Sequence, residues 1–128
     1  MKIEHIAIWV KDLEKMKDFY LKYFNTSCGE KYTNPKKKYA SYFIIFPEVP
    51  RLELMHREDI LDRGSKFTEH FGWAHIAISL GSKENVVDLT ERFRMDGWTI
   101  AGEPRITGDG YFESVILDPE GNRIELTI

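Results

Sequence analysis

The sequence predicts an α+β fold in which two β-α-β-β-β modules follow one another within a single domain. Residues 5–8, HIAI, recur at 75–78, which is 70 residues later. Residues 47–54 recur at 119–126 in the pattern Pro-Glu-x-x-Arg-(Leu/Ile)-Glu-Leu, at an offset of 72. Strand and helix patterns follow in the same order in both copies. A repeat of this length with only two copies is typical of a duplicated supersecondary unit.

The first module occupies about residues 1–57. An alternating pattern predicts a strand over 3–10, in which His5 and Trp9 share one face. Asp12 is a suitable N-cap for the helix that follows, and Asn25 is a stop signal. Apolar residues recur at helical spacing between them, at Leu13, Met16, Tyr20 and Tyr23. Further strands are predicted over 26–33, 39–46 and 51–57, with turns at 34–35 and 47–50.

The second module occupies about residues 73–128, after a polar linker at 58–72 that we interpret as a loop with room for one helical turn. A strand is predicted over 73–80, and Ser82 caps a helix with Val86, Leu89 and Phe93 on one stripe. Gly97 stands where a helix C′ glycine belongs. The remaining strands are predicted over 98–106, 111–117 and 123–127, with turns at 108–110 and 118–122.

Composition narrows the functional classes. The 128 residues suffice for one domain with a real core, and 42% hydrophobic with 30% charged residues is ordinary for a globular protein. A net charge of -3 gives no electrostatic reason to expect nucleic acid. Cys28 is the single cysteine, which favours a reducing compartment. No apolar run is long enough for a signal peptide or a membrane span, so we expect a cytoplasmic protein.

Each copy opens with a histidine and closes with a glutamate. In the last strand Ile124 and Leu126 take one face and Glu125 the other, so the apolar face is expected to pack on the helices. The polar set then lies on the opposite, concave face, where unpaired burial is costly. A lone strand histidine is more often structural than a ligand, but the duplication favours a metal site. We predict that four residues bind one divalent ion, Ni²⁺ or Zn²⁺ and alternatively Co²⁺ or Mn²⁺, namely His5, Glu53, His75 and Glu125.

In its His and Glu residues and their flanking motifs, the chain resembles the vicinal-oxygen-chelate superfamily, and within it the glyoxalase I branch (lactoylglutathione lyases). The resemblance covers essentially all 128 residues. It rests on His5, on NPKKKY at 34–39, on LEL at 52–54, on GWAHIA at 72–77 and on DPEGNRIE at 118–125. The last motif is specific to the superfamily but not to one reaction, and the His/Glu/His/Glu quartet is similar to that of glyoxalase I.

The resemblance implies a cup-shaped, glyoxalase-like sheet with the metal inside, in a homodimer whose modules complete shared sites. It also implies the isomerisation of a hemithioacetal, formed from methylglyoxal or another 2-oxoaldehyde and a thiol, to a 2-hydroxyacyl thioester. The metal stabilises the enediolate and a glutamate ligand moves the proton. Glu125 is our candidate for the mobile base, with Glu53 as the alternative.

The substrate-binding residues depart from the glyoxalase I pattern. An arginine that grips a glutathione carboxylate commonly stands four residues after the first histidine, where this chain has Trp9, and an asparagine often stands where it has Arg57. Candidates for substrate contacts are Trp9, Arg57, Lys38 and Arg105, with Tyr42 as a further pocket wall, and the identity of the thiol stays open. Of the spare histidines, His56 is interpreted as structural or exposed, and His70, on the linker, as lying either near the mouth of the cup or in water.

Two other functional classes remain alternatives. One is a different metalloenzyme of the same superfamily, an epimerase or an extradiol dioxygenase; a fourth protein ligand, Glu53, argues against oxygen chemistry by occupying a position that oxygen would use. The other is a metal-independent binding module similar to the bleomycin-resistance proteins, which usually lack the intact quartet.

Overall fold

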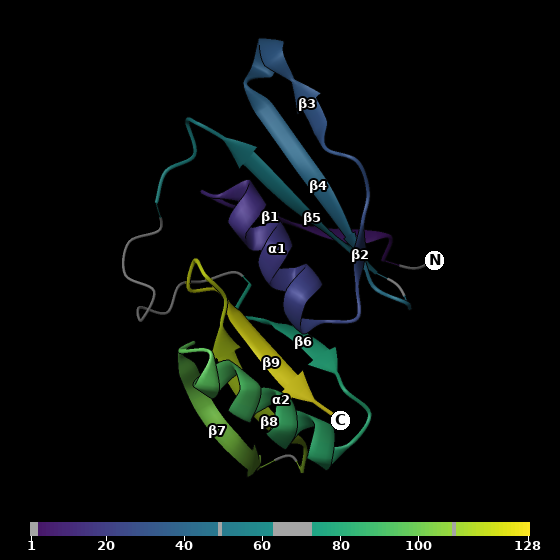
Figure 1. Cartoon of the computed structure of the whole chain (residues 1–128), viewed down its shortest axis with the longest axis vertical. Helices are drawn as coiled ribbons and strands as arrows, with labels where there is room; N and C mark the ends of the chain where they lie inside the picture. Colours follow the sequence, from purple (N-terminus) through teal and green to yellow (C-terminus); the bar gives the residue numbers. More distant parts are fainter. Residues whose placement is uncertain (1–2, 49, 63–72, 109) are drawn as a thin grey trace. The chain divides into compact units, whose positions relative to one another are not determined.

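The protein divides into two compact units, residues 1–62 and 63–128, in a computed structural model that describes residues 3–48, 50–62, 73–108 and 110–128. Within the described residues, each unit contains one sheet and one α-helix (Figure 1). The predicted α+β class is therefore confirmed. The linker residues Gly64 and His70, and the turn residue Asp109, lie outside the described part of the chain.

The first unit is a mixed sheet in the order β1-β5-β4-β2, in which β3 also pairs with β4. Strand β1 runs parallel to β5, and the other pairs are antiparallel (Figure 1). The elements are β1 (His5–Trp9), α1 (Leu13–Tyr23), β2 (Ser27–Cys28), β3 (Tyr32–Asn34), the 3₁₀ turn η1 (Pro35–Lys37), β4 (Tyr39–Ile45) and β5 (Arg51–Arg57).

The single strand predicted over residues 26–33 is wrong, because this segment forms two short strands on β4. Cys28 pairs with Ile44, but Tyr32 pairs with Ser41, so the segment has one more residue than the partner strand between these two points. A β-bulge absorbs such an extra residue and interrupts the ladder. The interruption includes Gly29, which has no side chain to place.

Helix α1 begins and packs as the sequence predicts. The carboxylate of Asp12 accepts a hydrogen bond from the backbone N–H of Lys15 at 2.9 Å, as an N-cap residue should. The predicted stripe is buried, together with Phe19, and the helix ends at Tyr23, just before the predicted stop signal at Asn25. It covers one face of the sheet, which carries the buried residues Ile44, Leu52 and Leu54.

The second unit has the order β6-β9-β8-β7, with β6 parallel to β9 and the other pairs antiparallel. The Oγ atom of Ser82 accepts a hydrogen bond from the backbone N–H of Asn85 at 3.2 Å, which confirms the predicted start of the helix. Gly97 has a φ of +81°, which confirms its predicted end. The elements are β6 (Ile76–Ser79), α2 (Lys83–Met95), β7 (Ile100–Ile106), β8 (Phe112–Leu117) and β9 (Arg123–Thr127).

Strand β9 is positioned by the turn that precedes it. Buried Asp118 accepts the backbone N–H groups of Glu120 and Asn122 through Oδ1, at 2.9 Å each, and the side-chain amide of Asn122 through Oδ2 at 2.8 Å. Gly121 takes a φ of +84°, which favours glycine. The DPEGN motif therefore has a structural role: it sets where the strand that carries Glu125 begins.

Among the described residues, no helix combines the length and the apolar character that crossing a membrane requires.

Candidate functional site

His5 and Glu53 form a pair on the face of the first sheet that points away from α1. The parallel register places Ala7 opposite Glu53, one position along from His5. The Nε2 atom of His5 lies 3.7 Å from Oε2 of Glu53. Glu53 keeps 14% of its side chain exposed, whereas Leu52 and Leu54 beside it are buried on the helix side. The predicted alternation of faces along β5 is thus confirmed.

Tyr39 holds the other oxygen of Glu53. Its hydroxyl donates a hydrogen bond to Oε1 at 2.9 Å. Burial, together with the Glu53 carboxylate, raises the pKa of Tyr39, so the hydroxyl keeps its proton and remains a donor. Sequence reasoning missed this role. The one signal in the sequence is that Tyr39 ends the NPKKKY motif, which is among the motifs that carry the family resemblance.

The opposite edge of the His5 ring is also held. Its Nδ1 contacts the carboxylate of Glu4, which in turn binds the guanidinium of Arg51. The hydrogen bond with His5, which has the largest effect, and the one with Arg51 lower the pKa of Glu4. The Glu4 carboxylate therefore stays ionised.

Of the three substrate-contact candidates in this unit, two lie near Glu53 and the third does not. The rings of Trp9 and Tyr39 meet edge to face, with their centroids 6.2 Å apart. The guanidinium of Arg57 lies 5.3 Å from the Trp9 ring centroid. Lys38 is exposed and its Nζ lies 3.0 Å from Oε2 of Glu58. Trp9 and Arg57 therefore stay near Glu53, while Lys38 is engaged in a surface ion pair.

Tyr42 does not line this face, so the prediction for it is wrong. It pairs with Leu54, on the helix side of the sheet, and its hydroxyl donates to Glu14 of α1 at 3.2 Å. The Nζ of Lys17 lies 5.1 Å from its ring centroid. His56 is structural as predicted, since its Nδ1 lies 2.9 Å from the carbonyl oxygen of Val10.

The second unit repeats the pair. Ala77 stands opposite Glu125 in the parallel register, as Ala7 stands opposite Glu53. The Nε2 atom of His75 lies 3.3 Å from Oε2 of Glu125. The duplication seen in the sequence is therefore a duplication of geometry.

A pocket of about 380 Å³ adjoins this second pair. The guanidinium of Arg105 extends across this pocket, where its Nη2 donates a hydrogen bond to Oε1 of Glu113 at 2.9 Å. A Cβ atom added to Gly102 would lie only 2.8 Å from Nη1 of Arg105. Gly102, which has no side chain, thus makes room for the guanidinium of Arg105. The lining residues are His75, Ala101, Gly102, Arg105, Glu113, Val115, Arg123 and Glu125.

Glu125 lies in a different electrostatic environment from Glu53. Burial and the neighbouring Glu113 carboxylate raise the pKa of Glu125, and they outweigh the opposing effects of His75 and Arg105. Glu113 is a second residue that sequence reasoning missed; the signal was a charged residue amid the apolar residues of β8, where it is buried. Glu125 is consequently more basic than an ordinary glutamate.

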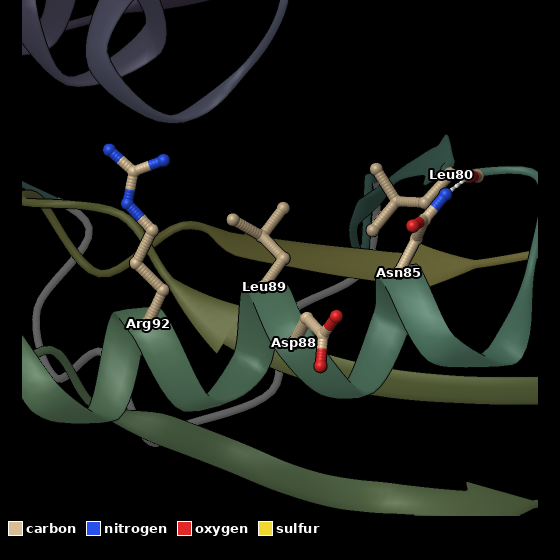
Figure 2. Close-up of a pocket in the computed structure, with 5 residues that line it drawn as sticks. All are labelled: Leu80, Asn85, Asp88, Leu89 and Arg92. Carbon is tan, nitrogen blue, oxygen red and sulfur yellow. Dashed lines mark hydrogen bonds between the residues drawn. The ribbon is translucent and has the colours of Figure 1, made fainter.

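A second hollow, of about 320 Å³, lies along α2. Figure 2 shows its lining, in which Asn85 donates from Nδ2 to the carbonyl oxygen of Leu80 at 2.7 Å. None of the predicted site residues belongs to it. Its lining residues are Leu80, Asn85, Asp88, Leu89 and Arg92.

The donor chemistry of the two pairs fits a divalent metal. Each pair supplies one imidazole nitrogen and one carboxylate oxygen, the ligands of first-row divalent ions that bind without thiolate. Donors 3.3 and 3.7 Å apart are close enough for both to lie about 2.0–2.2 Å from a single ion. Within the described residues no three His, Cys, Asp or Glu side chains gather as a metal-binding group, and each unit brings together one histidine and one glutamate.

Residues 2–126 match the family model described as Glyoxalase/Bleomycin resistance protein/Dioxygenase superfamily. Among curated proteins, the chain is 27% identical over 130 residues to a lactoylglutathione lyase of Escherichia coli O157:H7, and 26% identical over 132 residues to one of Salmonella typhimurium. Each of these matches covers 98% of this chain and 91% of the relative.

Solved structures with the same fold include glyoxalase I enzymes. The maize (Zea mays) enzyme is 25% identical, with a TM-score of 0.79 over 98% of this chain, which spans 44% of the length of the maize chain. A trypanothione-dependent glyoxalase I of Leishmania major is 24% identical, with a TM-score of 0.78 over 99% of this chain and 86% of its own. The glyoxalase-like fold is therefore confirmed.

Proposed function

Because the chain belongs to the Glyoxalase/Bleomycin resistance protein/Dioxygenase superfamily, we propose that it is a metal-dependent lyase of the glyoxalase I type. Its substrate is the hemithioacetal of a 2-oxoaldehyde, such as methylglyoxal, and a thiol; its product is the 2-hydroxyacyl thioester. The observation that carries this proposal is the repeated His–Glu pair at equivalent register in the two sheets. The curated relatives named lactoylglutathione lyase support it.

The proposed ligands of the metal are His5, Glu53, His75 and Glu125. Ni²⁺ or Zn²⁺ is the expected ion, with Co²⁺ or Mn²⁺ as alternatives, because two imidazoles and two carboxylates form a mixed N/O set. When bound, the ion supplies Lewis-acid polarisation of the substrate oxygens.

Glu125 is the proposed base. In the isomerisation the carbon that bears sulfur gives up its hydrogen as a proton, and the adjacent carbon receives one, so the carboxyl group that accepts the proton also returns it. The hydroxyl proton of the first carbon is lost as its C=O forms, and the oxygen of the second carbon gains a proton. A carboxylate with a raised pKa is better suited to this task than one held by a neutral hydroxyl donor. Glu53, fixed by Tyr39, is therefore assigned the ligand role alone.

Substrate contacts are proposed for Arg105, Trp9, Arg57 and Lys38. Arg105 has the strongest support, because it lines the same pocket as Glu125. Trp9 and Arg57 stack on one another close to Tyr39. Lys38 has the weakest support, since its ammonium group is engaged with Glu58.

The proposed assembly is a homodimer in which modules of two chains complete each site. The single His–Glu pair that each unit carries supports it, because one pair alone does not complete a four-ligand set. The proposed location is the cytoplasm, with which the free thiol of Cys28 is consistent.

The test is a turnover screen of metal-stripped protein reloaded with Ni²⁺ or Zn²⁺. Methylglyoxal is supplied with glutathione and, in parallel, with thiols that lack carboxylates, and thioester formation is followed. Metal content is measured in the same samples and in the His5→Ala and His75→Ala variants. We expect thioester with at least one thiol, and stoichiometric metal only in the unmodified protein. A metal-loaded protein that forms no thioester would instead favour epimerisation or dioxygenase chemistry, and a protein that binds no metal would favour the binding-module alternative.

A further inference from the structure

The His5 ring is held on the side that faces away from Glu53. Its Nδ1 atom contacts an oxygen of the Glu4 carboxylate, while its Nε2 atom points to Glu53, 3.7 Å away. A carboxylate can only accept a hydrogen bond, so this contact requires the proton of a neutral His5 ring to be on Nδ1. The lone pair is then on Nε2, on the side of Glu53.

Glu4 is itself fixed from two directions. The Nη2 atom of Arg51 binds the second oxygen of Glu4. The guanidinium of Arg51 lies 4.3 Å from the centroid of the Phe43 ring, and His5 meets the same ring edge-on at 5.5 Å. The four residues therefore form a closed ring of contacts, in which each side chain touches two others of the set.

The second copy lacks two members of this ring. Arg123 stands where the first copy has Arg51, but Ala74 replaces Glu4 in front of the histidine. Val115, the cross-strand partner of Glu125, replaces Phe43, the partner of Glu53. His75 consequently has no carboxylate on the residue before it, and it serves as an internal comparison.

We propose that Glu4 is a positioning residue for His5, which it holds in the Nδ1–H tautomer with Nε2 aimed at the metal position, and that Arg51 holds Glu4 in place for this purpose. The inference rests on the proposed function, because it assigns Glu4 and Arg51 to the same metal site. Ligating histidines usually donate their second ring N–H to a carboxylate or carbonyl, which orients the ring and raises its basicity. The Glu4 and His5 side chains are 57% and 39% exposed, so the pair adds little to fold stability. Its effect is expected on the histidine and not on the fold.

The direct test is the tautomer of His5 in the metal-free protein, read from the ¹⁵N chemical shifts of the imidazole. The pH is held where the ring is neutral, as verified in the same spectra. We expect Nδ1–H to predominate for His5 and the distribution to move towards Nε2–H in Glu4→Ala and, less strongly, in Arg51→Leu. Glu4→Gln retains an acceptor oxygen and should keep part of the bias. The matched control is Glu91→Gln, an exposed glutamate of α2, which should leave His5 unchanged.

The second readout is the affinity for Ni²⁺, measured by competition with a chelator. Loss of such a partner typically weakens metal binding about 10- to 100-fold, so we expect a loss of this size in Glu4→Ala with an unchanged melting temperature of the metal-free protein. A His5 tautomer that is the same in Glu4→Ala and in the unmodified protein overturns the proposal. If the unmodified protein binds no metal, the proposed function fails, but the tautomer measurement still decides the role of Glu4.

Discussion

The hydroxyl of Tyr39 donates a hydrogen bond to Oε1 of Glu53 across 2.9 Å. The equivalent carboxylate of the second copy, Glu125, lies instead beside the carboxylate of Glu113, and burial raises its pKa. Two glutamates at equivalent places in a duplicated fold therefore have different environments. One is anchored by a neutral donor and the other is made more basic, which is the basis for assigning them different roles.

Tyr39→Phe removes the donor that holds Glu53 and keeps the aromatic ring. Hydrogen bonds to charged groups contribute about 1.5–3 kcal/mol, and we expect Ni²⁺ affinity to fall by roughly tenfold because Glu53 is no longer fixed. Chelator competition measures the change, with Tyr111→Phe, an exposed tyrosine of the second unit, as the control. Equal affinities in Tyr39→Phe and the unmodified protein would show that this contact does not order the ligand.

Glu125→Gln and Glu53→Gln should differ in their kinetic effect. General acid–base catalysis contributes about 10²–10⁴-fold, so we expect Glu125→Gln to lower kcat by that amount even in protein samples matched for bound metal. In Glu53→Gln the loss should follow the loss of metal and be restored in part by excess Ni²⁺. The reverse pattern, with metal-matched Glu53→Gln inactive and Glu125→Gln active, would make Glu53 the base.

The Trp9→Arg, Arg57→Asn double variant places at both positions the residues that the resemblance to glyoxalase I leads one to expect. Trp9→Arg alone would put a second cation beside the guanidinium that now lies 5.3 Å from the Trp9 ring. We therefore expect the double variant to gain more than either single variant in kcat/KM with glutathione, by roughly ten- to a hundredfold over the unmodified protein. A thiol without carboxylates is the control and should show no such gain.

Glu14 should give the stability of the first unit a measurable pH dependence. Its carboxylate accepts hydrogen bonds from the ammonium groups of Lys17 at 2.7 Å and Lys31 at 2.9 Å. These bonds lower the pKa of Glu14 from 4.5 to about 2. A lowered pKa means that the folded state favours the ionised form, so this contribution is present above pH 4.5 and is lost as pH falls towards 2.

The corresponding variant is Glu14→Gln. At pH 7 its unfolding free energy should be lower than that of the unmodified protein, and this difference should vanish towards pH 2. The difference should also shrink in 1 M salt, because half of the Glu14 side chain is exposed. Glu84→Gln, which changes the glutamate in the first turn of α2, is the matched control. Urea unfolding at several pH values measures both; a deficit in Glu14→Gln that is constant between pH 7 and 2 would contradict the assignment.

Much of the fold was predictable because its signals are local. The N-caps at Asp12 and Ser82 bond the backbone three residues on, and Gly97 ends a helix through its own φ. Alternation along β5 and β9 places Glu53 and Glu125 opposite the apolar face, whatever the partner strand is. The two copies also identify each other's equivalent residues, which is why the amino-acid sequence is enough to name all four His and Glu candidates.

The tertiary structure alone decided what surrounds those pairs. Tyr39 reaches Glu53 only because β4 and β5 pair in one register, and Glu113 reaches Glu125 through the pairing of β8 with β9. The same register moves Tyr42 to the helix side, and the extra residue between Cys28 and Tyr32 splits a strand that looks continuous in the sequence. Register depends on hydrogen bonds between segments far apart in the chain, and a shift of one residue exchanges the two faces of a strand. Local patterns can therefore name the metal-ligand candidates, but only the pairing of the strands fixes their neighbours and, through them, the raised pKa of Glu125.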